Sequence, residues 1–167
     1  MHMKGQEERR FVVNLRHDGG YRYISQASED GRLHGEPYVS DEPDPVGAAS
    51  GPATPALLGS ALAHCLSAAL LEALRHAHVD VVDFETEAVA VVKPNEEGLP
   101  RIERVDVKIR PHLAQPSPRT QRCEDVFEKY CTVTSSVKRG IEVNVDVEWK
   151  IEEVEAAGEA APRRAAA

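Results

Sequence analysis

The sequence has few aromatic residues and no excess of positive charge. Phe, Trp and Tyr make up 5% of the chain, which disfavours the aromatic surfaces on which nucleic-acid bases stack. Twenty Lys and Arg residues stand against 28 Asp and Glu residues, giving a net charge of −8. Because such a chain repels phosphate groups, we expect no nucleic-acid partner.

Cysteine is also scarce, and a secretory signal is not evident. Three cysteines form an odd set for a disulfide-stapled secreted protein, and 167 residues are enough to build an ordinary core. The first residues lack the basic, apolar and small-residue regions of a signal peptide. These features favour a cytoplasmic protein with reduced thiols. We expect a flexible segment over residues 1–9, one domain over 10–150, and an Ala- and Glu-rich disordered tail over 151–167.

Long apolar runs are limited to a single segment within residues 51–80. Residues 57–74 are almost entirely Ala, Leu, Gly, Ser or Cys, and apolar side chains occur on nearly every side of a helix built from them. Such a helix is typical of a buried position. Polar residues interrupt the run too often for a membrane span, so we expect no membrane partner. The interrupting residues are Ser60, His64, Ser67 and Glu72.

Alternating patterns on both sides of this helix predict antiparallel hairpins. Residues 10–17 and 21–27 flank the turn signal Asp18-Gly19-Gly20, and a short strand is expected at residues 38–40. An irregular loop rich in Pro and Gly should cover residues 41–55. A second hairpin is expected from residues 81–93 and 101–110.

The C-terminal part predicts one more helix and one more strand. Ser117-Pro118 should begin a helix whose apolar stripe is Cys123, Val126, Phe127 and Tyr130. A turn should follow at residues 134–138, and residues 141–149 show regular alternation of a strand. The order β-β-β-α-β-β-α-β predicts an α+β domain with antiparallel sheets around a long buried central helix. A homodimer would supply the cover that such an apolar helix needs.

Two of the three cysteines are candidates for chemistry. Cys65 is either a small core residue or a reactive thiol; the second role requires a cation, since the helix N-terminus is almost three turns away. Cys131 lies just beyond the apolar stripe, so the pattern predicts a structural role for it less strongly than for a cysteine on the stripe. Cys123 belongs to that stripe and is predicted to be structural.

Other possible sites are weaker. His64, His76 and His78 lie near Cys65 in the sequence, but adjacent helical residues point about 100° apart and no paired Cys-x-x-Cys accompanies them, so we expect no metal. Ser135-x-x-Lys138 matches an acyl-enzyme motif without its companion motifs.

Two motifs resemble those of a known family. Gly51-Pro52, Pro55 and the run Ala61-Leu62-Ala63-His64-Cys65-Leu66 are similar to the central-helix signature of the OsmC/Ohr superfamily. The run Lys129-Tyr130-Cys131-Thr132-Val133-Thr134 resembles that family's Lys-Tyr-Cys-Pro-Val-Ser turn, with Thr132 in place of proline. The resemblance covers about residues 10–150. It implies an intertwined homodimer of α+β subunits and a thiol-dependent peroxidase that reduces organic hydroperoxides.

The resemblance also assigns roles to individual residues. Cys65 matches the peroxidatic cysteine and Cys131 the resolving cysteine, with an external dithiol as reductant and no cofactor. Family peroxidases carry a Glu soon after the helix-start proline, whereas this chain has Ala56-Leu57-Leu58. Glu42 is a possible substitute. Arg16 and Arg22 are candidates for the activating arginine, and Arg22 lies between two tyrosines whose rings could hold it.

The missing Glu keeps a second function open. A non-catalytic OsmC-like protein would use the apolar cleft of the dimer to bind a small hydrophobic ligand. The sequence therefore leaves two hypotheses, a hydroperoxide reductase and a binding protein.

Overall fold

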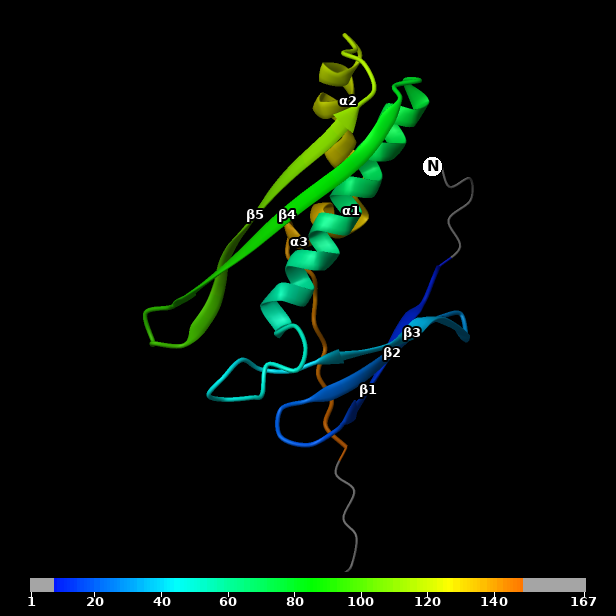
Figure 1. Ribbon diagram of the computed structural model, residues 1–167. Helices are drawn as coiled ribbons and strands as arrows, with labels where there is room; N and C mark the ends of the chain where they lie inside the picture. Colours follow the sequence, from blue (N-terminus) through cyan, green and yellow to red (C-terminus); the bar gives the residue numbers. More distant parts are fainter. Residues whose placement is uncertain (1–7, 149–167) are drawn as a thin grey trace, which may run out of the picture.

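The computed structural model describes residues 8–148 and shows a mixed α+β fold. A three-stranded antiparallel sheet precedes the long helix α1, and a two-stranded antiparallel hairpin and short helices follow it (Figure 1). The predicted fold class and the predicted central helix are confirmed. The predicted segment 1–9 lies mostly outside the described residues, and the predicted tail 151–167 lies entirely outside them.

The N-terminal sheet has the order β1-β2-β3, formed by β1 (Phe11–His17), β2 (Tyr23–Glu29) and β3 (Arg32–Ser40). The first hairpin forms as predicted, with Leu15 opposite Ser25. Strand β3 is longer than predicted because Asp30 and Gly31 form a tight turn, both with positive φ (47° and 82°). Pro37 does not prevent β3 from forming, since β3 is an edge strand and a proline there leaves no ladder hydrogen bond unmade.

The second hairpin comprises β4 (Val81–Pro94) and β5 (Pro100–Leu113) and also follows the prediction. Its strands run alongside α1 for most of the length of that helix (Figure 1). Residues of β4 that face α1, including Phe84 and Thr86, are partly buried, while their neighbours Glu85 and Glu87 are exposed. The alternation of β4 therefore separates a helix-facing side from a solvent-facing side.

Helix α1 (Thr54–His76) begins with Pro55 in its first turn, where a proline removes no helical hydrogen bond. The prediction that this helix is buried on nearly all sides is wrong for the single chain. Only one stripe is buried, formed by Gly59, Leu62, Leu66, Leu70 and Leu74. The residues follow steps of three or four, so they occupy one face, and β4 together with the short helices is too narrow to cover the others.

By length and composition alone, α1 is also apolar enough to cross a membrane. The core helices of soluble proteins pass the same test. One helix of this kind is weak evidence for a membrane span.

The hydrophobic core lies at the C-terminal half of α1. Leu70, Leu74, Val79 and Cys123 form its buried cluster, and side chains of β4, β5 and the segment after α2 pack around it. The Cys123 thiol donates to the Ala73 carbonyl oxygen with 3.5 Å between Sγ and O, and the residue is 4% exposed. Its position in the core agrees with the predicted structural role.

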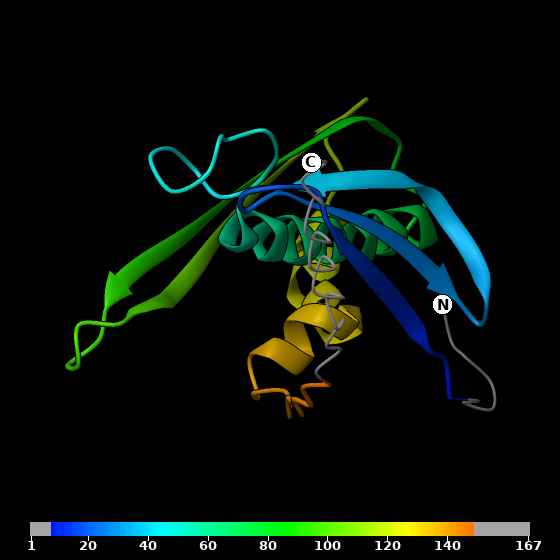
Figure 2. The same cartoon turned by 90° about the horizontal axis from the view of Figure 1, so that it is seen from below.

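The C-terminal helical region differs from the single helix and turn that the sequence predicts. Helix α2 (Thr120–Val126) passes into the 3-10 helix η1 (Phe127–Tyr130), and α3 (Thr132–Val137) replaces the predicted turn at residues 134–138. Because Cys131 is extended, with ψ of 103°, it breaks the helix and begins a new one. Tyr130 consequently leaves the apolar stripe and is 63% exposed. These helices lie on the side of α1 away from β4 and β5 (Figure 2).

The predicted last strand does not form in the described part, residues 141–148, although the pattern for it is regular. Val143, Val145 and Val147 are between 62% and 83% exposed. A strand needs a neighbour to satisfy its backbone groups and bury its apolar side, and the described residues of the single chain supply none here. Residue 149, the end of the predicted strand, lies outside the described residues.

Candidate active site

The candidate site lies where the middle of α1 meets the junction between η1 and α3. Cys65 on α1 is partly exposed, and Cys131 at the junction is fully buried, with an exposed fraction of 0%. Both cysteines are free thiols, and Cys131 is close enough to Cys65 for its sulfur to accept a hydrogen bond from the Cys65 thiol. The structure thus brings together the two residues that the family resemblance assigns to one reaction.

Backbone geometry holds Cys131 in place. Its N–H donates to the Glu128 carbonyl oxygen (3.2 Å), and its carbonyl oxygen accepts the Ser135 N–H (3.1 Å). The Cys131 thiol donates to the Thr134 hydroxyl oxygen, with 3.1 Å between Sγ and Oγ1. Since Cys131 precedes the first residue of α3, its position is fixed by the end of one helix and the start of the next.

Burial and the neighbouring thiol together raise the pKa of Cys65 above its ordinary value. Desolvation is the larger cause, because it disfavours the thiolate, and the hydrogen bond between the protonated Cys65 thiol and the Cys131 sulfur is the next. The backbone N–H groups of Val133 and Thr134 act in the opposite direction and lower the pKa. Charge repulsion from Cys131 also raises the pKa, and no Lys, Arg, Asp or Glu side chain of residues 8–148 is among these causes.

Neither candidate arginine contacts Cys65 within the chain. Arg22 pairs with Asp18, with 2.8 Å between Nη1 and Oδ2, while Arg16 is 71% exposed and lies 3.7 Å from the same carboxylate. Arg22 is therefore held by a carboxylate and not by the neighbouring tyrosine rings as we expected; the cation–π contact found in this sheet joins Arg9 and Phe11. The buried Nε of Arg22 has no hydrogen-bond partner among the described residues.

The loop before α1 carries Glu42 and is fixed by its neighbour Asp41. The Asp41 carboxylate accepts hydrogen bonds from the Ser50 hydroxyl (2.7 Å) and from the backbone N–H groups of Glu42, Ala48 and Ser50. These bonds, first of all the one from the Ser50 hydroxyl, lower the pKa of Asp41. Glu42 is partly buried in this fixed loop and does not appear among the groups that shift Cys65.

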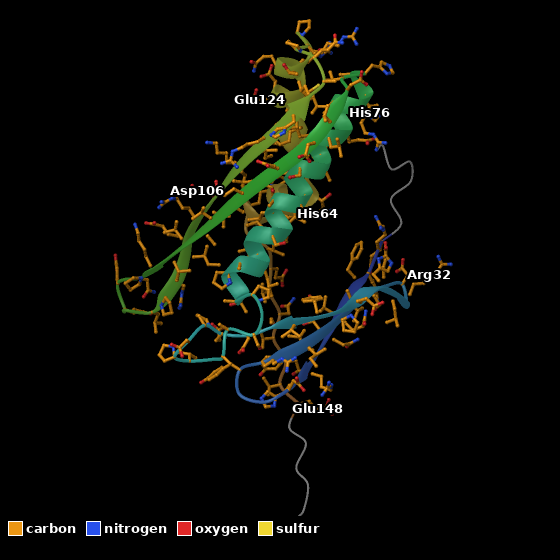
Figure 3. The ribbon with its side chains drawn as sticks, viewed as in Figure 1. Arg32, His64, His76, Asp106, Glu124 and Glu148 are labelled. Carbon is orange, nitrogen blue, oxygen red and sulfur yellow. The ribbon has the colours of Figure 1, made fainter. Side chains whose placement is uncertain are left out.

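The weaker sequence motifs do not assemble into sites. His64 and His76 lie far apart along α1, roughly 18 Å by the helical rise, as their labels in Figure 3 show. Within residues 8–148, no cluster of His, Cys, Asp and Glu could hold a metal ion. Lys138 forms an ion pair with Glu128 (2.6 Å), and the Ser135 hydroxyl donates to the Glu128 carbonyl oxygen (3.3 Å), so both side chains support the turn around Cys131.

An open groove runs along α1 beside β4, with a volume of about 430 Å³. Hydroxyl and imidazole groups interrupt its apolar wall, and the Ser67 and Thr86 hydroxyl groups bridge the helix and the strand with 2.6 Å between their oxygens. The lining residues on α1 are Ser60, Ala63, His64, Ser67, Ala68 and Leu71, and those on β4 are Phe84 and Thr86.

The sequence analysis did not identify Thr134. This residue is 8% exposed and contributes its hydroxyl to Cys131 and its backbone N–H to Cys65. A signal was present, because Thr134 follows Cys131 by three residues, the spacing that brings the residue before a helix close to the third residue of that helix. The predicted turn at residues 134–138 concealed that relation.

The family model for OsmC-like proteins matches residues 47–146, a stretch that includes α1, the second hairpin and both cysteines of the site. The chain belongs to the OsmC-like family. A search of curated proteins finds no match.

Solved structures of OsmC-like proteins share this fold at low sequence identity. An OsmC-like protein from Mycoplasma pneumoniae is 16% identical, with a TM-score of 0.59 and coverage of 79% of this chain and 88% of that one. An OsmC-like protein of unknown function from Vibrio cholerae is 14% identical, with a TM-score of 0.58 and coverage of 78% and 93%. An organic hydroperoxide resistance protein from Elizabethkingia anophelis is 16% identical, with a TM-score of 0.54 and coverage of 83% and 92%.

Replacing Cys131 with Ala should make Cys65 more acidic. The substitution removes the hydrogen bond and the charge repulsion by which Cys131 raises the pKa of Cys65. The rate of Cys65 alkylation, followed by mass spectrometry over a range of pH, should therefore rise at lower pH in Cys131→Ala than in wild type. Cys123→Ala is the matched control and should not move the profile. An unchanged profile in Cys131→Ala would show that the two thiols do not interact.

Proposed function

We propose that the protein is a thiol-dependent peroxidase that reduces organic hydroperoxides. The Cys65 thiolate attacks the O–O bond, the alcohol departs after taking up a proton, and Cys65 becomes a sulfenic acid. Cys131 then attacks the Cys65 sulfur, a disulfide forms, and the sulfenic oxygen departs as water. An external dithiol reduces the disulfide by exchange.

The observation that carries this proposal is the contact between a partly exposed and a fully buried thiol. A peroxide can reach Cys65 from solvent, while Cys131 is shielded from oxidation and positioned for the second step. The apolar residues of α1 around Cys65 suit an alkyl hydroperoxide better than hydrogen peroxide. Several structural relatives are named organic hydroperoxide resistance proteins, which supports the same substrate class.

A thiol with a raised pKa is a poor nucleophile at neutral pH, so the proposed reaction needs a cation near Cys65. Residues 8–148 of the single chain place no basic side chain among the groups that shift the pKa of Cys65, and we propose that a second copy supplies the cation. Arg22 is the favoured residue because Asp18 fixes its guanidinium while its Nε remains without a hydrogen-bond partner among the described residues. Arg16 is more exposed, and Glu42 is the candidate carboxylate partner of the arginine.

Exposed apolar surface supports a homodimer as the functional form. The sheet β1-β2-β3 exposes Phe11, Val13 and Leu15 on one face, and residues 141–148 expose an alternating row of valines. Much of α1 outside its buried stripe is equally uncovered. Monomers rarely expose apolar surface on this scale, and a second copy presents the same surfaces in complementary positions.

The homodimer can be tested by sedimentation equilibrium at micromolar concentration. We expect the mass of two chains, because the apolar surfaces of α1, of the first sheet and of residues 141–148 need cover. Replacing Val143 and Val145 with Lys should shift the population toward monomer. A folded wild-type protein with the mass of one chain would contradict the proposal.

The arginine can be tested through the pH dependence of Cys65 alkylation. A guanidinium beside the thiolate lowers the pKa of Cys65, so Arg22→Met should raise it and leave less thiolate at neutral pH. We expect peroxide reduction to slow about tenfold at neutral pH and to approach the wild-type rate at high pH, where the thiolate forms without help. Arg16→Met tests the other candidate, and because Arg16 is 71% exposed we expect this variant to titrate like wild type. If both variants titrate like wild type, neither arginine activates Cys65.

The alternative function is a non-catalytic protein that binds a small hydrophobic ligand. The raised pKa of Cys65 and the apolar residues Ala56-Leu57 at the helix start favour it, and the groove between α1 and β4 offers space. In this case the two cysteines would be part of a binding surface and would not cycle between thiol and disulfide.

Thiol counting with cumene hydroperoxide separates the two functions. Of the three free cysteines, the peroxidase should lose two with one equivalent of peroxide and regain them with a dithiol. Cys65→Ser should lose none, whereas Cys123→Ser should melt at a lower temperature and still lose two. A wild-type protein that keeps all its thiols would favour the binding protein.

The free thiols also bear on the compartment. Cysteine residues that must return to the reduced state after each turnover need a reducing environment, and we propose the cytoplasm.

A further inference from the structure

The hydroxyl of Thr134 contacts the thiol of Cys131 but has no role in the reaction steps proposed above. Thr134 lies in the first turn of α3 and is 8% exposed, while Cys131 is fully buried. The Cys131 thiol donates to Thr134 Oγ1 across 3.1 Å. A buried thiol rarely needs a hydroxyl partner for stability alone, because cysteine packs well as a small apolar residue.

This hydrogen bond determines where the Cys131 hydrogen points. With the hydrogen directed at Thr134, a lone pair of the Cys131 sulfur is left to face Cys65, whose thiol it contacts. The hydroxyl can also rotate, accepting from a thiol and donating to a thiolate. A hydrogen bond to the charged sulfur is roughly twice as strong as one to the neutral form. Thr134 therefore favours the attacking state of Cys131 over its resting state.

We propose that Thr134 is a positioning residue that prepares Cys131 to attack Cys65. The inference rests on the proposed peroxidase function, in which Cys131 resolves the Cys65 sulfenic acid. In that step the Cys131 sulfur forms a bond to the Cys65 sulfur as the S–O bond of the sulfenic acid breaks. The Cys131 proton and the departing hydroxide leave as water. As Cys131 loses this proton, the Thr134 hydroxyl turns and donates a hydrogen bond to the Cys131 sulfur.

The titratable groups around Cys131 do not offer a competing explanation. Cys65 approaches it from α1, and Glu128 and Lys138 form an ion pair with exposed side chains on η1 and at the end of α3. Lys129 and Tyr130, which precede Cys131, are exposed. The hydroxyl of Thr134 is thus the polar side-chain group that the structure bonds directly to the resolving thiol.

The experiment compares Thr134→Val, which keeps the shape and removes the hydroxyl, with Thr134→Ser, which keeps the hydroxyl. Thr132→Val is the matched control, because Thr132 is an exposed residue of the same helix. Cumene hydroperoxide oxidises Cys65, and a dione reagent that traps sulfenic acids measures how long the intermediate survives. We expect Thr134→Val to form the sulfenic acid at the wild-type rate and to resolve it about tenfold more slowly, the change in rate that corresponds to one ordinary hydrogen bond.

A second arm measures the attack by Cys131 without peroxide. A small aromatic disulfide is allowed to form a mixed disulfide with Cys65, and Cys131 then displaces the aromatic thiolate, whose release is followed optically. This exchange releases one aromatic thiolate and one proton and leaves the disulfide between Cys65 and Cys131. The same tenfold delay is expected in Thr134→Val, and wild-type rates are expected in Thr134→Ser and Thr132→Val.

The two arms distinguish failure of the inference from failure of the proposed function. If wild type does not react with cumene hydroperoxide, the peroxidase proposal fails, while the aromatic disulfide still reports on Thr134. A wild-type release rate in Thr134→Val overturns the inference, as does a slow rate that Thr134→Ser does not restore. Should Thr134→Val fail to fold, Thr134→Ala replaces it in the same comparison with Thr134→Ser.

Discussion

Packing between the C-terminal half of α1 and the elements on both sides of it is the interaction on which the rest of the structure depends. Leu70 and Leu74 are buried together with Cys123, so the helix is fixed at once to the second hairpin and to the region of α2 and η1. Because η1 leads directly to Cys131, this core also determines where along α1 the junction between η1 and α3 makes contact. Cys65 is two to three turns before Leu74 on the same helix. The contact between the thiols is thus a consequence of core packing.

The same packing leaves apolar surface of the single chain exposed to solvent. One stripe of α1 is buried, while the first sheet and residues 141–148 carry apolar side chains in contact with solvent. The candidate site also lacks something that the proposed reaction needs, since the pKa of Cys65 is raised and no basic side chain of the described residues is among the groups that shift it. A second copy would answer both needs, covering apolar surface and bringing an arginine. Dimerisation and the activation of Cys65 would therefore depend on the same contact between two chains.

The sequence predicted the elements whose signals are local. The periodicity of residues 57–74, the turn residues around Gly19 and the expected strands at residues 81–93 and 101–110 identified α1 and the two hairpins. Helix and hairpin formation depend on neighbouring residues, which is why these signals were local. It failed for the last strand, where alternation was clear but the partner strand was missing. It also failed at Cys131, since an extended residue between two short helices leaves no periodic mark.

The candidate site was predictable only in part. Cys65 and Cys131 were paired through resemblance to a family, because their separation in the sequence carries no information about their contact. Arg22 could be named from the predicted strand over residues 21–27, but it lies in the turn before β2, and its ion pair with Asp18 depends on the geometry of that turn. Thr134 was missed because its role follows from the start of α3, which propensity did not predict. Chemistry that depends on tertiary contacts was therefore the part that the sequence concealed.

The central claim is that Cys65 and Cys131 form one redox site within a chain. The most direct measurement is peptide mapping by mass spectrometry after oxidation with one equivalent of cumene hydroperoxide, with two isotopically distinct preparations mixed to separate links within a chain from links between chains. The account predicts a single disulfide-linked peptide pair, Cys65 with Cys131, from the same chain, with Cys123 reduced. A disulfide that includes Cys123, a link between chains, or a sulfinic acid on Cys65 without a disulfide would contradict it.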